Sequence, residues 1–207
     1  MGNDDHSLHE LIRGCIDRDL QLMEQFYHRF APEMWVVCLR YAKSAMMAED
    51  VMQEGFIRAF DTMAGYSGTG SFHGWLRRVF VTTALNHLKR YHRYEKVEHQ
   101  VDQVYHLDNR DRVDAVSRMQ ADQLMELISV LPDGARAVFN LYVIEGYSHR
   151  EISELLGFSE ANSRSQLYRA RLLMQQALEQ IDLYNESNSK EQNSNQISDK
   201  HHGAKNR

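Results

Sequence analysis

The stretch "SHREISELLGFSEANSRSQLYRARL", residues 148–172, decides the fold, because it contains the start and stop signals of two consecutive helices. Ser148, with Glu151 three residues later, has the spacing of a capping box, and Gly157 can adopt the left-handed conformation that ends a helix. Ser159 can then cap a second helix, whose apolar residues recur at helical spacing. The stretch therefore predicts a short helix, a tight turn and a second helix.

Such a pair of helices can close a core, or it can form a DNA-binding helix-turn-helix whose second helix lies in the major groove. Helical spacing alone favours the ordinary hairpin, because bundles often carry arginines on their solvated faces. The composition of the second helix favours DNA, since no acid occurs between Glu160 and Glu179 and its amide and guanidinium groups match base edges and phosphates. The candidate DNA contacts are Asn162, Arg164, Ser165, Gln166, Tyr168 and Arg169.

The rest of the 207-residue chain is also predicted to be helical. Apolar residues recur at helical spacing, only two prolines occur, and the sustained alternation typical of strands is missing. The polar segment 95–116 predicts a flexible linker between one small helical domain over 1–94 and a second over 117–183. The segment 184–207, rich in Asn, Ser and Gln, predicts a disordered tail. The expected fold class is therefore all-α with two domains.

Charge is distributed unevenly along the chain. The net charge of −5 argues against a uniformly basic nucleic-acid binder, yet six basic residues and a single acid lie between 77 and 96. A solvated helix face would explain these charges equally well. The glycine-rich segment 65–76 lies directly before them, and an aromatic ring there could stack on a base pulled from a duplex while cations neutralise phosphates. Its aromatic residues are Tyr66, Phe72 and Trp75, of which Trp75 is assigned to the core.

Three stretches carry a family pattern in a fixed order. They are "AEDVMQEGFIRAF" (48–60), "YSGTGSFHGWLRRVFVTTALNHLKR" (66–90) and "LPDGARAVFNLYVIEGYSHREISELLGFSEANSRSQLYRAR" (131–171). The chain resembles the extracytoplasmic-function (ECF) group of sigma factors in the sigma-70 family. In that family the three regions dock on core RNA polymerase, melt the promoter and read its upstream element.

The resemblance implies a protein without catalytic activity that binds core RNA polymerase and directs promoter-specific DNA binding and transcription initiation. It makes 1–94 a region 2 domain and 117–183 a region 4 domain. It implies promoter DNA as a second partner and an anti-sigma factor, in many cases membrane-bound, as a third. The core polymerase-binding residues that it implies are Asp50, Gln53, Glu54, Phe56 and Arg58.

The resemblance also distributes the DNA contacts over two promoter elements. For the upstream element it favours Arg164, Ser165, Tyr168 and Arg169, although Asn162-Ser163 stand where the family commonly has Thr-Val, and Gln166 where it often has a basic residue. Many relatives have Asn where this chain has Thr82, which carries fewer hydrogen-bonding groups. The downstream-element residues are Tyr66, Phe72, Arg77, Arg78, Thr82, Asn86, Lys89, Arg90 and Arg93.

Two other classes of function are less well supported. A conventional helix-turn-helix repressor or activator acting without core polymerase would explain residues 148–172 but would leave the segment 65–96 without a role. An enzyme is not expected, because no phosphate-binding loop, catalytic triad or paired-carboxylate motif occurs in a suitable context. Cysteine and histidine spacing predicts neither a metal site nor a cofactor. The chain shows neither an apolar run long enough for membrane insertion nor a signal-peptide pattern, so we expect it in the cytoplasm.

Overall fold

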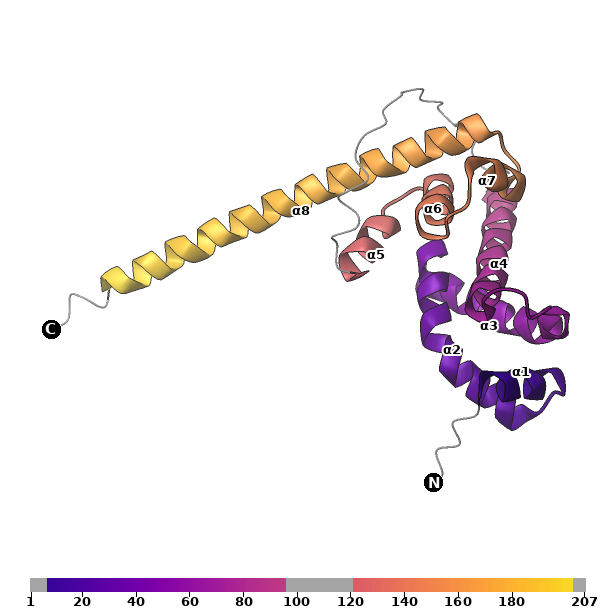
Figure 1. The fold of residues 1–207 in the computed structure, drawn as a ribbon. Coiled ribbons are helices and arrows are strands. Elements are labelled where there is room, and N and C mark those ends of the chain that lie inside the picture. Colours follow the sequence, from indigo (N-terminus) through magenta and orange to yellow (C-terminus); the bar gives the residue numbers. More distant parts are fainter. Residues whose placement is uncertain (1–6, 96–120, 203–207) are drawn as a thin grey trace.

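A computed structural model of the chain describes residues 7–95 and 121–202, with side chains for 7–90 and 123–181 (Figure 1). All regular elements in these ranges are helical, which confirms the all-α prediction. The predicted linker 95–116 lies outside the described residues, apart from its first position. The elements of the first part are α1 (Leu8–Ile16), α2 (Leu20–Tyr41), α3 (Ala45–Thr62), the 3₁₀ turn η1 (Met63–Gly65) and α4 (Phe72–Glu95).

Side-chain caps set the starts of the first three helices. The Glu10 amide donates to Ser7 Oγ and the Ser7 amide donates to the Glu10 carboxylate, which together form a capping box at α1. Asp19 accepts hydrogen bonds from two amides at the start of α2, and Ser44 accepts one from Met47 at α3. Each cap satisfies amides that have no partner within the helix, so these boundaries are encoded locally.

The core of the first part is built around aromatic rings. Phe26 is fully buried and contacts Phe72 edge to face, with ring centroids 5.9 Å apart. Phe56 of α3 meets Phe80 of α4 in the same geometry at 5.0 Å. Gly55 lets these helices approach closely, because a Cβ at this position would lie 2.5 Å from the Phe80 ring. Helices α2, α3 and α4 therefore pack as one unit, with α1 against α2.

The second part is a smaller helical unit around one apolar stripe of α8. Pro132 precedes α6, and the chain leaves α6 through a π-helical turn, η3. Leu127, Leu141 and Ile152 are buried together with the inward stripe of α8. The elements are α5 (Ala121–Ser129), α6 (Asp133–Phe139), η3 (Asn140–Ile144), α7 (His149–Leu156) and α8 (Glu160–His202).

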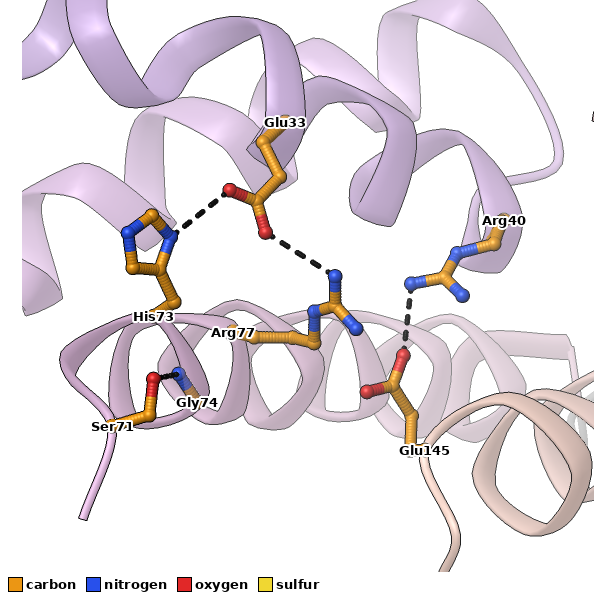
Figure 2. A network of polar contacts seen from close by, with 7 residues as sticks. All are labelled: Glu33, Arg40, Ser71, His73, Gly74, Arg77 and Glu145. Atoms are coloured by element: carbon orange, nitrogen blue, oxygen red, sulfur yellow. Dashed lines mark hydrogen bonds and ion pairs between the residues drawn. The ribbon is translucent and has the colours of Figure 1, made fainter.

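The two parts meet at the C-terminal end of α2. Arg40 and Glu145 form an ion pair of 2.8 Å between side chains only 8% and 6% exposed (Figure 2). The Asn140 side-chain amide donates to the Arg40 carbonyl, and the Arg136 guanidinium donates to the Ala42 carbonyl, each at 2.8 Å. These three contacts therefore join polar side chains of the second part to α2 and the residue after it.

Helix α8 continues well beyond the rest of the second part (Figure 1). The helix runs to His202, within the segment 184–207 for which the composition predicts a disordered tail, and that assignment stays a prediction. No glycine or proline occurs between Phe158 and Gly203, so no residue in this segment breaks a helix. The composition of this segment provides few apolar groups to bury, and that property is separate from its capacity to form a helix.

Candidate nucleic-acid interface

The helix-turn-helix consists of α7 and the first turns of α8. The Glu151 amide donates to Ser148 Oγ (3.3 Å) and the Ser148 amide donates to the Glu151 carboxylate (2.8 Å), which completes the predicted capping box. Gly157 ends α7 at φ 76°, in the left-handed region. The Asn162 amide donates to Ser159 Oγ at 3.2 Å. All three local predictions for this motif are confirmed.

The two sides of α8 differ in burial. Its inward stripe is Ser163, Leu167, Ala170 and Met174, and all four side chains are buried. The outward residues differ in how exposed they are. Several of them lie on the same side of α8, because positions three, four or seven apart face the same way on a helix. Asn162, Arg164 and Arg169 are exposed, while Ser165 and Tyr168 are half-buried.

Gln166 is the outlier among the predicted upstream-element residues. Its side chain lies over Gly134 at the start of α6, where an added Cβ would come within 3.4 Å of the Gln166 amide carbon. The side chain therefore packs towards the body of the second part. Gln166 is half-buried there, and its assignment as a base contact stays a prediction.

One face of α4 carries four of the predicted downstream-element residues. Arg78, Thr82 and Lys89 are exposed and Asn86 is half-buried, at spacings of three or four residues that align them along the helix. Lys89 Nζ donates to the Leu155 carbonyl of α7 at 2.6 Å, so this ammonium group contacts the second part. Arg93 lies on the last turns of α4, beyond the described side chains.

Arg77 lies about a quarter turn of α4 away from the exposed face, on the side that meets α2. Its guanidinium is 3.2 Å from Glu33 Oε1, and the other oxygen of that carboxylate is 3.3 Å from His73 Nδ1 (Figure 2). Since successive helical residues are about 100° apart, one step in sequence separates Arg77 from the exposed face of Arg78. This side chain joins α4 to α2, and its predicted contact with DNA stays a prediction.

Glu54 forms the second polar link between helices of the first part. Its carboxylate contacts Arg58 Nη2, His87 Nε2 and Arg90 Nη2, each at 2.6 Å. Burial alone would raise the pKa of Glu54, but the hydrogen bonds from Arg90 and His87 and the charges of Arg90 and Arg58 outweigh it and lower the pKa to about 2. Both carboxylate oxygens are thus occupied within the chain, and Arg90 is held beside α3.

A pocket of about 300 Å³ opens between α3 and the exposed face of α4. Its lining is mostly apolar, and it includes the side chains of Arg58 and Arg78. An aromatic or apolar ring could enter while a phosphate met these cations. The sequence had assigned Arg58 to polymerase binding, whereas the structure brings it together with the candidate DNA residues. The complete lining is Arg58, Thr62, Trp75, Arg78, Val79 and Thr82.

The loop before α4 holds Tyr66 in a defined position. Its hydroxyl donates to the Gly70 carbonyl at 2.9 Å, and its ring lies 5.3 Å from Phe72 and 5.5 Å from Trp75. Phe72 itself is only 5% exposed and contacts Phe26 in the core. This corrects the assignment of Phe72 to DNA, because a buried ring has no free face for a base. Trp75, which was assigned to the core, is half-buried beside the pocket.

Some of the predicted polymerase-binding residues are exposed and others are buried. Asp50 and Gln53 are exposed on α3. Phe56 is 4% exposed and packs on Phe80, so the structure corrects its assignment from a polymerase contact to a core residue. Two exposed apolar residues on the same helix, Met46 (73%) and Ile57 (60%), were not among the predicted contacts. Their positions outside the buried apolar stripe of α3 were the sequence signal that could have indicated a docking surface.

Within the described ranges, no helix is long and apolar enough to cross a bilayer, and no group of three or more His, Cys, Asp or Glu side chains could hold a metal ion. The two cysteines, Cys15 and Cys38, are buried. Burial raises the pKa of the Cys38 thiol to about 12 and that of Cys15 to about 11.

Two family models match the chain in the order of its two helical parts. Sigma-70 region 2 matches residues 26–94, and sigma-70 region 4 matches residues 121–174. Together they cover more than half of the chain. The chain belongs to the sigma-70 family of RNA polymerase sigma factors.

Known relatives narrow this class to the ECF group. The ECF RNA polymerase sigma factor SigE of Mycolicibacterium smegmatis is 32% identical over 151 residues, which cover 72% of this chain and 58% of SigE. RNA polymerase sigma-H factor of Pseudomonas aeruginosa is 26% identical over 159 residues, 69% of this chain and 79% of that protein. The solved structure of the sigma factor RpoE of Bartonella quintana, in complex with the anti-sigma factor NepR, is 16% identical with a TM-score of 0.47, and covers 75% of this chain and 96% of that one. The chain is an ECF sigma factor.

Proposed function

We propose that this sigma factor binds its partners through three separate surfaces. The exposed side of α3 docks on core RNA polymerase, the exposed face of α4 with its pocket contacts the downstream promoter element, and the outward side of α8 contacts the upstream element. The observation that carries this proposal is the contiguous polar face of α4, because a repressor that acts through its helix-turn-helix alone has no use for it. The protein acts here by binding and requires no catalytic group.

The polymerase surface rests on the exposed residues of α3. Asp50 and Gln53 offer polar groups, while Met46 and Ile57 offer apolar area that no described element covers. An amphipathic helix with an acidic edge suits a basic helical partner, because charge guides the encounter and apolar burial holds the complex. Glu54 supports this surface from behind by fixing α3 to α4.

The downstream-element surface combines a pocket with a line of polar groups. A base leaving the duplex could stack near Tyr66 and Trp75, and its neighbouring phosphates could meet Arg78 and Arg58 at the pocket. Thr82 and Asn86 offer hydrogen-bonding groups to the same strand. Arg58 and Arg90 would each have to leave Glu54 before they could contact a phosphate.

The upstream-element surface is the start of α8. Asn162, Arg164 and Arg169 are exposed there and can donate to bases or phosphates, with Ser165 and Tyr168 between them. We also expect an anti-sigma protein as a regulatory partner, as in other sigma factors of this group. Its attachment to a membrane stays a prediction from the resemblance.

In vitro transcription tests the proposal directly. Purified core RNA polymerase is incubated with a pool of genomic promoter fragments, with and without this protein, and the transcripts are sequenced. We expect a set of transcripts that requires both proteins and whose start sites share an upstream and a downstream element. Failure to initiate, together with tight binding of the protein alone to a palindromic duplex, would contradict the proposal and favour a repressor.

A further inference from the structure

His149, the first residue of α7, connects three elements of the second part. Its Nδ1 lies 2.8 Å from Ser163 Oγ, on the first turn of α8. Its ring stacks on Tyr142, with centroids 4.5 Å apart and planes 22° from parallel. Tyr142 belongs to the π-helical turn η3. One side chain therefore fixes the start of α8 relative to both α7 and η3.

Ser163 is the only polar residue of the inward stripe described for α8, and it is fully buried. A buried hydroxyl requires a hydrogen-bond partner, since leaving it without one costs more than the bond itself contributes. His149 provides this partner. The His149 ring nitrogen and the Ser163 hydroxyl therefore satisfy each other's need for a hydrogen-bond partner.

The position of Ser163 connects this pair to DNA recognition. Its sequence neighbours Asn162 and Arg164 are both exposed and lie on the two flanks of the helix. A small rotation or shift of this turn moves both side chains together. Contacts to base edges depend on direction, so a displacement of this kind weakens base discrimination more than it weakens general attraction to DNA.

We propose that His149 is a positioning residue for the recognition helix, which it holds in register through the Ser163 hydroxyl and the Tyr142 ring. This inference rests on the proposed role of α8 in reading the upstream element. The role differs from a direct DNA contact, because Nδ1 is used inside the protein and the ring face is covered by Tyr142.

The electrostatic surroundings favour the neutral ring. Burial and the nearby charges of Arg164 and Arg171 lower the pKa of His149, while Glu160 opposes them. A neutral imidazole with its proton on Nε2 can accept a hydrogen bond from the Ser163 hydroxyl at Nδ1. Directional bonding, rather than charge, is therefore what His149 contributes to this contact.

Matched variants separate the hydrogen bond from the stack. His149→Phe keeps an aromatic ring on Tyr142 and removes the bond, whereas His149→Asn keeps a polar group near the place of Nδ1 and removes the ring. Ser163→Ala removes the hydroxyl alone. Each variant is assembled with core RNA polymerase and tested on promoters found by the transcription experiment above, either intact or with their upstream element altered. The readout is the ratio of initiation on the intact and the altered promoter.

We expect His149→Phe and Ser163→Ala each to lower this ratio about three- to tenfold, the value of one hydrogen bond. The double variant should lose no more than either single one, because both remove the same bond. His149→Asn should keep part of the ratio, and the salt dependence of promoter binding should match the wild type in all variants. Circular dichroism checks that each variant is folded.

Three results would overturn the inference. Unchanged ratios in both single variants would show that the bond does not position α8, and additive losses in the double variant would show that the two residues act separately. A salt dependence reduced by about one phosphate contact would make His149 a DNA contact itself. If instead the wild-type holoenzyme does not distinguish the two promoters, the proposed function fails, and the variants play no part in that result.

Discussion

The two candidate DNA-binding helices, α4 and α8, carry similar numbers of cations but engage them differently. On α4, Arg77 is held by Glu33, Arg90 by Glu54 and Lys89 by the Leu155 carbonyl, all from other elements. On α8, the only ion pair described for the DNA-facing side is a local one between Arg164 and Glu160 at 2.9 Å, one helical turn apart.

The contrast shows that the number of charges in a segment does not measure the charge available to a ligand. The basic block of the first part serves two purposes, because some of its cations join helices and others face outward. The start of α8 has a single purpose, since its inward stripe is apolar apart from Ser163. Packing between helices therefore controls the first surface, and local helix geometry controls the second.

The largest expected effect comes from removing the cations of α8. Replacing Arg164 and Arg169 together with Ala should abolish promoter-specific transcription, since each contact to a base or phosphate is worth roughly 1–3 kcal/mol. Binding to core polymerase should be unchanged, because both residues lie in the second part. Transcription assays and a pull-down with core polymerase measure the two properties. Loss of core binding by a folded double variant would contradict the assignment of separate surfaces.

Two glycines, Gly157 in the helix-turn-helix and Gly74 in α4, distinguish the effect of backbone geometry on stability from that of packing. Gly157→Ala should lower the free energy of unfolding by about 1–2 kcal/mol, because φ is 76° and an L-residue is strained there. Gly74→Ala in α4 should have the opposite sign and stabilise by up to about 1 kcal/mol, since its Cβ would meet only Ser71 at 3.8 Å. Urea denaturation measures both. Equal effects of the two changes would contradict local control of the helix-turn-helix.

Glu54→Gln tests the ionic link between α3 and α4. The variant should be about 1–2 kcal/mol less stable at pH 7, because charged hydrogen bonds to Arg90 and His87 are weakened. Since the pKa of Glu54 is lowered to about 2, its contribution is present above its ordinary pKa near 4.5 and lost as the pH falls towards 2.

The difference in unfolding free energy between wild type and Glu54→Gln should therefore shrink between about pH 4.5 and pH 2, which denaturation at several pH values measures. Glu49→Gln, an exposed change on the same helix, is the matched control and should have little effect at any pH. A difference that stayed constant down to pH 2 would mean that Glu54 does not stabilise the fold through its charge.

The smallest effect compares two adjacent arginines. Arg78→Ala should lower the salt dependence of promoter binding by about one phosphate contact, because Arg78 lies on the exposed face of α4. Arg77→Ala should leave this dependence unchanged, since Glu33 holds its guanidinium on the other side. Measuring promoter binding by the holoenzyme across a range of salt concentrations separates them. A reversal of the two results would invalidate the orientation of α4.

Sequence reasoning predicted the features that are encoded locally. The Ser148 and Ser159 caps and the Gly157 turn all follow from short-range rules of backbone hydrogen bonding. Helical periodicity likewise predicted the buried Leu167, Ala170 and Met174 of α8, whereas it did not indicate the buried Ser163. The all-helical class required nothing beyond these patterns.

The errors concern contacts between residues far apart in the chain. Phe56 and Phe72 were assigned to partners because they lie in motifs, yet tertiary packing buries both. Arg77 and Arg78 are adjacent in the same helix. Periodicity could not show that Glu33 lies beside Arg77, so it gave no reason to separate the two arginines. The bond from His149 to Ser163 joins two helices across a turn, and no sequence pattern indicates it.

Site-specific photo-crosslinking in the complex of holoenzyme and promoter tests the central claim, that different sides of α4 and the outward side of α8 have separate roles. A photo-reactive amino acid replaces Thr82, Arg77 or Ser165, one at a time, and the crosslinked DNA positions are mapped. We expect crosslinks to the downstream element from position 82, to the upstream element from position 165, and none from position 77. Crosslinking from position 77 with none from position 82, or the downstream element crosslinked from position 165, would contradict the account.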